Sequence, residues 1–228
     1  MKSNKFYYFN KIYNKKDRYK KPKDIYKKLI QILKKEKKSK NLHLIDVGCA
    51  GGELLFNLRK NFDYKLTGVD VDEKLLRKAK TKCSKDIIFL KKDIFKNNFK
   101  GKKYDIIIFS GVLSIFQNGE KIFKNLMKIL KKKGKIFIFD SFNIYSYNLN
   151  ITATKYNKNK KIFWYKNMYS LDFIEKEAKK FKKKCKFFEF KMKANLKRNN
   201  KDLSLGWTET LSGRKIVTSG LGLIQNQF

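Results

Sequence analysis

Proline and histidine each occur once in this chain of 228 residues, and cysteine occurs three times. The single histidine, His43, precedes an expected strand, at the end of a parallel sheet away from bound ligands, so we do not expect it to act as a catalytic base. Cys49, Cys83 and Cys185 are odd in number and widely spaced, which excludes a disulfide framework and a metal knuckle. The sequence therefore predicts a reducing, cytoplasmic location and no metal site.

Long apolar runs are also missing. No segment approaches 18 uninterrupted apolar residues, so no transmembrane helix is expected, and residues 1–5 lack the apolar core of a signal peptide. Hydrophobic residues still make up 42% of the chain, which is enough for one α/β domain with a full core. The sequence stops soon after the apolar residues 221–224, and an edge strand that ends so abruptly suggests a shortened C-terminus.

Acidic residues and arginine are scarce, whereas lysine is abundant. The chain has 57 basic and 20 acidic residues, giving a net charge of +37, a value that favours nucleic acid or an anionic membrane as partner. However, only five of the basic residues are arginine, the side chain best suited to phosphate. Lys, Asn, Ile, Phe and Tyr share A/T-rich codons, so codon drift is our preferred explanation, and an RNA partner is the alternative.

The most informative segment is residues 44–53, Leu-Ile-Asp-Val-Gly-Cys-Ala-Gly-Gly-Glu. A buried strand runs into a turn of small residues (Gly48, Ala50, Gly52), and a helix begins near its end. Such a turn lets a ligand lie against bare backbone and next to unpaired N–H donors. A second apolar strand ends in Asp70, close to the spacing of about 20 residues expected for a carboxylate that binds ribose hydroxyls. The pattern predicts a nucleoside-binding unit.

The alternation of small residues after Asp46 resembles motif I of class I S-adenosylmethionine (SAM) methyltransferases, not the G-x-G-x-x-G of dinucleotide sites. The resemblance implies that Asp46 and the turn hold the methionine portion, Asp70 the ribose and Asp93 the adenine. Asp72 is expected instead to cap the following helix. The cofactor-binding residues implied are Asp46, Gly48, Cys49, Ala50, Gly52, Asp70, Val71, Asp93, Ile94, Ser110 and Gly111.

The resemblance extends over residues 42–140, because strands at about 87–94 and 104–113, and then a helix end, Gly turn and fifth strand within 130–140, follow in the family's order. It implies an α/β, three-layer, Rossmann-like methyltransferase fold. The expected sheet has seven strands, mostly parallel, with an antiparallel strand near one edge. We expect an N-terminal arm and helix over residues 1–41 and a methyltransferase domain over 42–228, with acceptor-side elements at about 141–170.

Periodicity and caps place the remaining elements. Pro22 is suited to open a helix, and Ser170 to cap one. Residues 142–161 are polar and show no clear period. The expected helices begin near residue 22 and span about 51–61, 72–81, 120–132 and 171–181, with a sixth strand at 186–190 and a hairpin over 207–218.

The acceptor should meet the methyl group beyond the carboxyl ends of the fourth and fifth strands. Methyl transfer is an in-line displacement at a sulfonium, and orientation and exclusion of water can supply much of its acceleration. The sequence offers little for a catalytic base. Asp140 is the best-placed acid, although it would serve equally as a turn acceptor, and Ser114 and Asn143 could hydrogen-bond an acceptor.

The C-terminal part carries a second resemblance. Residues 164–170, 205–213 and 219–223 resemble methyltransferases of bacterial surface-polysaccharide gene clusters. This implies a small-molecule acceptor, a sugar or glycan precursor, with Trp164 stacked on a pyranose face and Asn167 beside it. The alternatives are an RNA methyltransferase and a SAM-binding protein without catalysis. The acceptor, the methylated atom and the oligomeric state stay open.

Overall fold

The computed structural model describes residues 18–36, 41–96, 99, 101–157, 160–188, 207–211, 214–218 and 224–226. For 153–157, 160–165 and the strands beyond residue 206, only the backbone is described. The chain divides into two compact units, residues 1–185 and 186–228, and each is described by itself.

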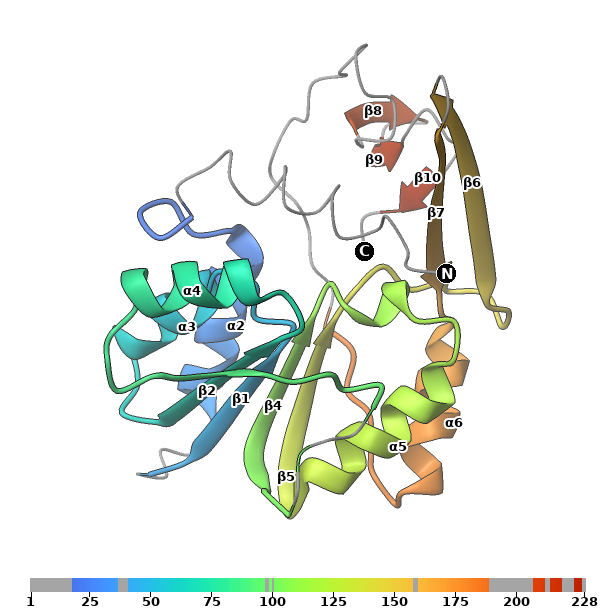
Figure 1. Ribbon diagram of the computed structural model, residues 1–228. Coiled ribbons are helices and arrows are strands. Elements are labelled where there is room, and N and C mark those ends of the chain that lie inside the picture. Colours follow the sequence, from blue (N-terminus) through green and yellow to red (C-terminus); the bar gives the residue numbers. More distant parts are fainter. Residues whose placement is uncertain are drawn as a thin grey trace. The chain divides into compact units, whose positions relative to one another are not determined.

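A parallel sheet of five strands, in the order β3-β2-β1-β4-β5, forms the centre of the first unit (Figure 1). Its strands are β1 (His43–Val47), β2 (Lys65–Asp70), β3 (Ile88–Lys91), β4 (Tyr104–Ser110) and β5 (Leu130–Phe139). The strand order reverses between β1 and β4, and both pair in parallel with their neighbours. The carboxyl ends of these strands therefore open a crevice at a topological switch point.

Two apolar layers sandwich this sheet, because successive strand residues point to opposite faces. Leu44 packs with residues of α2, α3 and α4 on one face, whereas Ile45 packs with residues of α5 and α6 on the other (Figure 1). The central strands are buried on both faces, as expected for a parallel sheet covered by helices. The predicted three-layer α/β fold is confirmed.

The helices begin close to the predicted residues. They are α2 (Asp24–Lys35), α3 (Glu53–Arg59), α4 (Glu73–Lys82), the 3-10 helix η1 (Leu113–Ile115), α5 (Gly119–Ile129) and α6 (Leu171–Lys180). The predicted caps are confirmed, since Asp72 accepts from the backbone N–H groups of Lys74 and Leu75, and Ser170 from that of Phe173. However, α5 ends at Ile129, and residues 130–132 belong to β5.

Residues 142–161 contain structure that their polar sequence did not predict. The strands β6 (Leu149–Asn157) and β7 (Lys160–Met168) form an antiparallel hairpin, separate from the central sheet. The central sheet thus has five strands instead of seven, because the antiparallel pair forms its own sheet. Residues 186–188, predicted to begin a sixth strand, have no regular structure, and Phe187 and Phe188 are exposed; residues 189–190 lie outside the described residues.

The second unit contains β8 (Trp207–Leu211), β9 (Arg214–Thr218) and β10 (Ile224–Asn226), an antiparallel sheet in the order β10-β9-β8. The predicted hairpin over 207–218 is confirmed by the pairing of β8 with β9. In the parts of both units that the structure describes, no helix is long and apolar enough to cross a membrane.

Candidate functional site

The turn after β1 holds three residues in the left-handed conformation, at φ +80° for Gly48, +48° for Ala50 and +78° for Gly52. The backbone N–H groups of Gly48 and Cys49 both donate to the carbonyl of Val69 in β2, at 2.8 and 3.0 Å. This conformation is easy for glycine and uncommon for alanine. The turn therefore lies tightly against the end of β2, just before α3 begins at Glu53.

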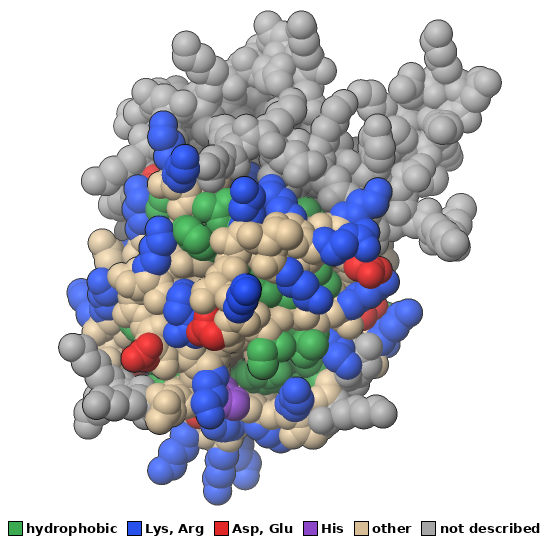
Figure 2. All heavy atoms as spheres, turned by 60° about the vertical axis from the view of Figure 1, so that its left-hand side comes forward, with side chains coloured by type: hydrophobic (Ala, Val, Ile, Leu, Met, Phe, Trp, Pro, Cys, Tyr) green, Lys and Arg blue, Asp and Glu red, His purple; other side chains and the backbone are tan. Residues whose placement is uncertain are grey.

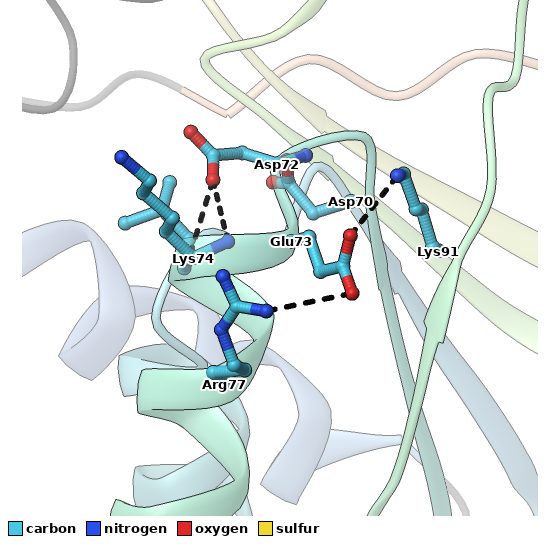
Figure 3. Close-up of polar contacts among 7 residues, drawn as sticks. Asp70, Asp72, Glu73, Lys74, Arg77 and Lys91 are labelled. Carbon is cyan, nitrogen blue, oxygen red and sulfur yellow. Dashed lines mark hydrogen bonds and ion pairs between the residues drawn. The ribbon is translucent and has the colours of Figure 1, made fainter.

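Asp70 fastens the same turn from the end of β2. One oxygen of its carboxylate accepts from the N–H of Ala50 at 2.9 Å, and the other from the N–H of Asp72 at 2.9 Å. Burial raises the pKa of Asp70 in spite of these bonds. Figure 3 shows Asp70 and Asp72 at the start of α4, apart from the ion pairs that Glu73 makes with Arg77 and Lys91.

Asp46 lies at the carboxyl end of β1 and is only 3% exposed. Burial raises its pKa to about 8, and the nearby charges of Asp70 and Glu53 add to this effect. Cys49, next to it in the turn, is also buried, and its thiol pKa is raised for the same reason. The predicted methionine end of the site therefore brings three acidic side chains close together, those of Asp46, Glu53 and Asp70.

Residues before α2 contact the turn after β1 and the start of α3, a contribution that the sequence analysis missed. The hydroxyl of Tyr19 donates to the carbonyl of Gly51 at 2.5 Å, and its ring meets Phe56 edge-on. Burial, together with the charge of Arg18, lowers the pKa of Lys23 to about 8, whereas Glu53 and Asp46 act in the opposite direction. No motif signals this contact, because it joins residues 32 positions apart and depends on how α2 packs.

The end of β3 supplies the predicted adenine side. The carboxylate of Asp93 accepts from the N–H of Phe95 at 2.9 Å, and Ile94 is buried. The side-chain amide of Asn125 in α5, which the sequence analysis did not select, donates to the carbonyl of Ile94 at 2.8 Å. These bonds hold the segment after β3 against α5, and the N–H of Lys92 donates to the carbonyl of Asp70 at the end of β2, at 3.0 Å. Val71, which follows Asp70, is 37% exposed.

The end of β4 touches the turn after β1. Ser110 ends β4, and Gly111 follows at φ +68°, with its N–H donating to the carbonyl of Phe139 at 2.7 Å. A Cβ added to Gly48 would lie 2.5 Å from a methyl group of Val112, whereas one added to Gly111 would meet nothing within 4 Å. The structure thus brings the predicted cofactor residues of four strands to one edge of the sheet, with open space beside Gly111.

Asp140, directly after β5, holds η1 in place. Its carboxylate accepts from the backbone N–H groups of Ser114 and Ser141, at 2.9 Å each, and from the Ser114 hydroxyl. Burial raises its pKa, and the charge of Lys166 opposes this change. The ammonium group of Lys166, another residue that the sequence analysis missed, donates to the hydroxyl of Ser141 at 3.2 Å. Asp140 therefore serves as a turn acceptor and also lies at the predicted acceptor edge.

Two asparagines selected from the sequence hold backbone segments near this edge. The Asn143 side chain donates to the carbonyl of Tyr147 at 2.8 Å and accepts from the N–H of Tyr145 at 3.1 Å. Asn167, 2% exposed, donates to the carbonyls of Ser114 at 3.1 Å and of Phe116 at 2.7 Å. Their direct contact with an acceptor stays a prediction.

Trp164 belongs to β7 and pairs with Ala153 of β6, and its side chain lies outside the description. No group of three His, Cys, Asp or Glu residues within the described ranges could hold a metal ion. His43 lines a hollow with Arg59 and Ile88 at the amino ends of β1 and β2, the opposite edge of the sheet from this site.

Comparison with known proteins gives a family for this arrangement. A family model described as a methyltransferase domain matches residues 38–201. A protein-lysine N-methyltransferase of Saccharomyces cerevisiae is 34% identical over 122 residues, covering 46% of this chain and 53% of that protein. A ubiquinone biosynthesis O-methyltransferase of Coxiella burnetii is 31% identical over 116 residues, covering 48% and 49%. The chain thus spans about half the length of these curated relatives.

Among solved structures, a protein from Pyrococcus horikoshii OT3 matches with a TM-score of 0.54 and 20% identity, covering 68% of this chain and 80% of that one. At this identity the likeness concerns the fold alone. The fold and the site define the class I, Rossmann-like architecture of SAM-dependent methyltransferases. The chain belongs to the methyltransferase domain family, which confirms the family predicted from residues 42–140.

Proposed function

We propose that this chain transfers a methyl group from SAM to a small-molecule acceptor, a sugar or glycan precursor. The Asp70 carboxylate, bonded to Ala50 of the left-handed turn, is the observation that carries the cofactor assignment. In this position it can accept from ribose hydroxyls while the turn approaches the methionine portion with bare backbone. Asp70 and Glu53, whose charges act on the buried Asp46, add negative charge that suits a cationic cofactor.

SAM would supply an electrophilic methyl group on its sulfonium. The chain's own residues would then orient the acceptor and exclude water beside the ends of β4 and β5. Asp140 and Asn167 hold η1 by hydrogen bonds, so η1 forms a wall of the acceptor side that is fixed before an acceptor arrives. A preformed wall is what orientation requires, since a displaced acceptor loses alignment with the methyl group.

A small acceptor is supported by two tyrosines in the loop after β5. Tyr145 and Tyr147 are 59% and 57% exposed, and their rings stack with centroids 5.9 Å apart. Asn143 holds the backbone of both residues. Exposed aromatic faces suit the flat apolar face of a sugar ring, and the resemblance of the C-terminal part to polysaccharide-cluster methyltransferases points to the same class. The curated relatives carry names with different acceptors, so they do not decide between classes.

The experiment is a transfer assay with radiolabelled SAM and three acceptor pools: sugar nucleotides and oligosaccharides, total RNA, and protein. We expect label in the sugar pool and none in the others above the level of an Asp70→Ala control. Label confined to RNA or protein would reject the sugar acceptor while keeping the methyltransferase. No transfer to any pool, with SAH (S-adenosylhomocysteine, the demethylated cofactor) still bound, would favour a binding protein without catalysis.

RNA is the second candidate because of the net charge of +37. Figure 2 shows Lys and Arg side chains scattered over the visible described surface, without one dominant stripe on this face. Dispersed charge predicts weak, sequence-blind binding that falls steeply with salt. A salt-resistant RNA complex would favour this candidate. The cytoplasmic location stays a prediction of the cysteine content.

A further inference from the structure

Lys166 differs from the exposed lysines that give the chain its charge. Burial lowers the pKa of its ammonium group, a direction shared among the described lysines only with Lys23 at the methionine end of the site. Long charged side chains usually keep their heads in water, and a withdrawn one costs free energy unless it is paired. The position of Lys166 beside the end of β5 therefore requires an interaction that offsets this cost.

The surroundings of Lys166 leave its charge incompletely compensated. Its Nζ donates to the Ser141 hydroxyl at 3.2 Å, the one hydrogen bond that it makes among the described residues. An ammonium group has three donors. The nearest opposing charge, Asp140, already accepts from Ser114 and Ser141, although it still favours the protonated form of Lys166.

The backbone that carries Lys166 is fixed to the acceptor edge. Lys166 pairs with Ile151 in the hairpin, and the next residue, Asn167, donates to the carbonyl of Phe116 at 2.7 Å. The hydroxyl of Tyr169 donates to the same carbonyl at 2.6 Å. The segment 166–169 is thus hydrogen-bonded to the end of η1. The Lys166 ammonium group bonds to Ser141, a residue that lies directly after β5.

We propose that Lys166 and the Ser141 hydroxyl form an anion-binding subsite that receives a carboxylate or phosphate group carried by a small-molecule acceptor. This inference rests on the proposed methyl transfer and narrows its acceptor class. Charge-assisted hydrogen bonds from a partly desolvated ammonium group are stronger than neutral ones. The exposed rings of Tyr145 and Tyr147, four and six residues after Ser141, would contact the uncharged body of such an acceptor.

The test follows the Lys166 side chain directly. The full chain, labelled with 13C at the lysine ε-carbons and saturated with SAH, is titrated with inorganic phosphate, with acetate and, at matched ionic strength, with sodium chloride. The Lys166 signal is identified by its loss in Lys166→Met. We expect phosphate or acetate, but not chloride, to raise the Lys166 pKa by about one pH unit, the lower end of what an opposite charge brings.

The two anions distinguish phosphate from carboxylate as the recognised group. Ser141→Ala should weaken the response, and Lys124→Met, an exposed lysine on α5, should leave it unchanged. Equal responses of all lysines, or no response of Lys166, would overturn the subsite. A short oligonucleotide that shifts Lys166 at lower concentration than phosphate would replace the small acceptor by RNA.

SAH affinity, measured by calorimetry in the same samples, separates this inference from the proposed function. If the wild-type chain does not bind SAH, the proposed function fails. If it binds SAH and Lys166 does not respond, only the subsite fails. A large loss of SAH affinity in Lys166→Met would place this lysine against the cofactor and would also overturn the subsite.

Discussion

The two sides of the site are built differently. The cofactor side, residues 46–94 at the ends of β1, β2 and β3, rests on left-handed turn residues and on backbone bonds such as those from Gly48 and Cys49 to Val69. The acceptor side, residues 112–169 around η1, rests on side chains that reach distant backbone, as Asn167 does across 53 residues to Ser114. Local sequence patterns therefore specify most of the cofactor side, whereas tertiary packing specifies the acceptor side.

The largest expected effect comes from overcrowding the place where the two sides meet, between Gly48 and Val112. Gly48→Val would place a Cβ 2.5 Å from Val112 while keeping φ at +80°. Strain of about 1–2 kcal/mol and overpacking of about 1–3 kcal/mol should both destabilise the fold, and SAH binding should be lost. Urea unfolding and calorimetry measure the two effects.

Gly111→Ala is the matched control for this prediction. Gly111 has φ +68° and nothing within 4 Å of an added Cβ, so only backbone strain of about 1 kcal/mol is expected. If both glycine variants lost the same stability, the contact between Gly48 and Val112 would not join the two sides.

Next in size is the loss of the Asp70 carboxylate. Asp70→Ala removes the acceptor for the N–H groups of Ala50 and Asp72, and we expect SAH affinity to fall about 10- to 100-fold, as for hydrogen bonds to a charged group. Asp72→Ala, which removes the side-chain cap of α4, should cost about 1 kcal/mol of stability and leave SAH affinity unchanged. Equal affinity losses in both variants would place the effect in α4 instead.

A pH effect of intermediate size should come from Asp46. Its pKa in the folded chain is raised to about 8, so the folded state holds a proton that the unfolded state releases above about pH 4. Its contribution to stability is therefore full below pH 4 and is lost as the pH rises toward 8. The free energy of unfolding of the wild type, measured with urea, should fall relative to that of Asp46→Asn as the pH rises from 5 to 8. A constant difference would show that Asp46 is ionised throughout this range.

The smallest expected effect lies on the acceptor side. Tyr169→Phe removes one hydrogen bond of 2.6 Å to Phe116, worth about 1 kcal/mol. Methyl transfer should slow about fivefold while SAH affinity stays unchanged, because only η1 is loosened. An equal loss of SAH affinity would mean that η1 also shapes the cofactor pocket.

The same division explains what the sequence could predict. The five central strands in their order along the chain, the turn at Gly48 and the caps Asp72 and Ser170 follow from local patterns and were predicted correctly. The hairpin of β6 and β7 could not be read from a polar segment without period, and the strand expected at residues 186–190 is absent from 186–188. In neither case does a local pattern in the sequence signal the outcome, although the two strands of the hairpin are adjacent in the chain.

Side-chain partners separated by long stretches of chain were missed for the same reason. Tyr19 and Lys23 approach the turn from the N-terminal arm, and Lys166 approaches Asp140 from β7. No spacing rule joins these residues, because each contact depends on how α2 or the hairpin packs. Asn143 and Asn167 were selected as candidates for acceptor binding, and their side chains hydrogen-bond to backbone segments of the acceptor edge.

The central claim is that the cofactor side binds SAM through its own bonds, independently of the acceptor side. Calorimetric titration of SAH into Asp70→Ala and Asn167→Leu, both first shown to be folded by circular dichroism, tests it most directly. We predict a loss of about 10-fold or more for Asp70→Ala and a change of less than about twofold for Asn167→Leu, since sites without shared partners act independently. Unchanged affinity in folded Asp70→Ala, or a loss of equal size in Asn167→Leu, would contradict the claim.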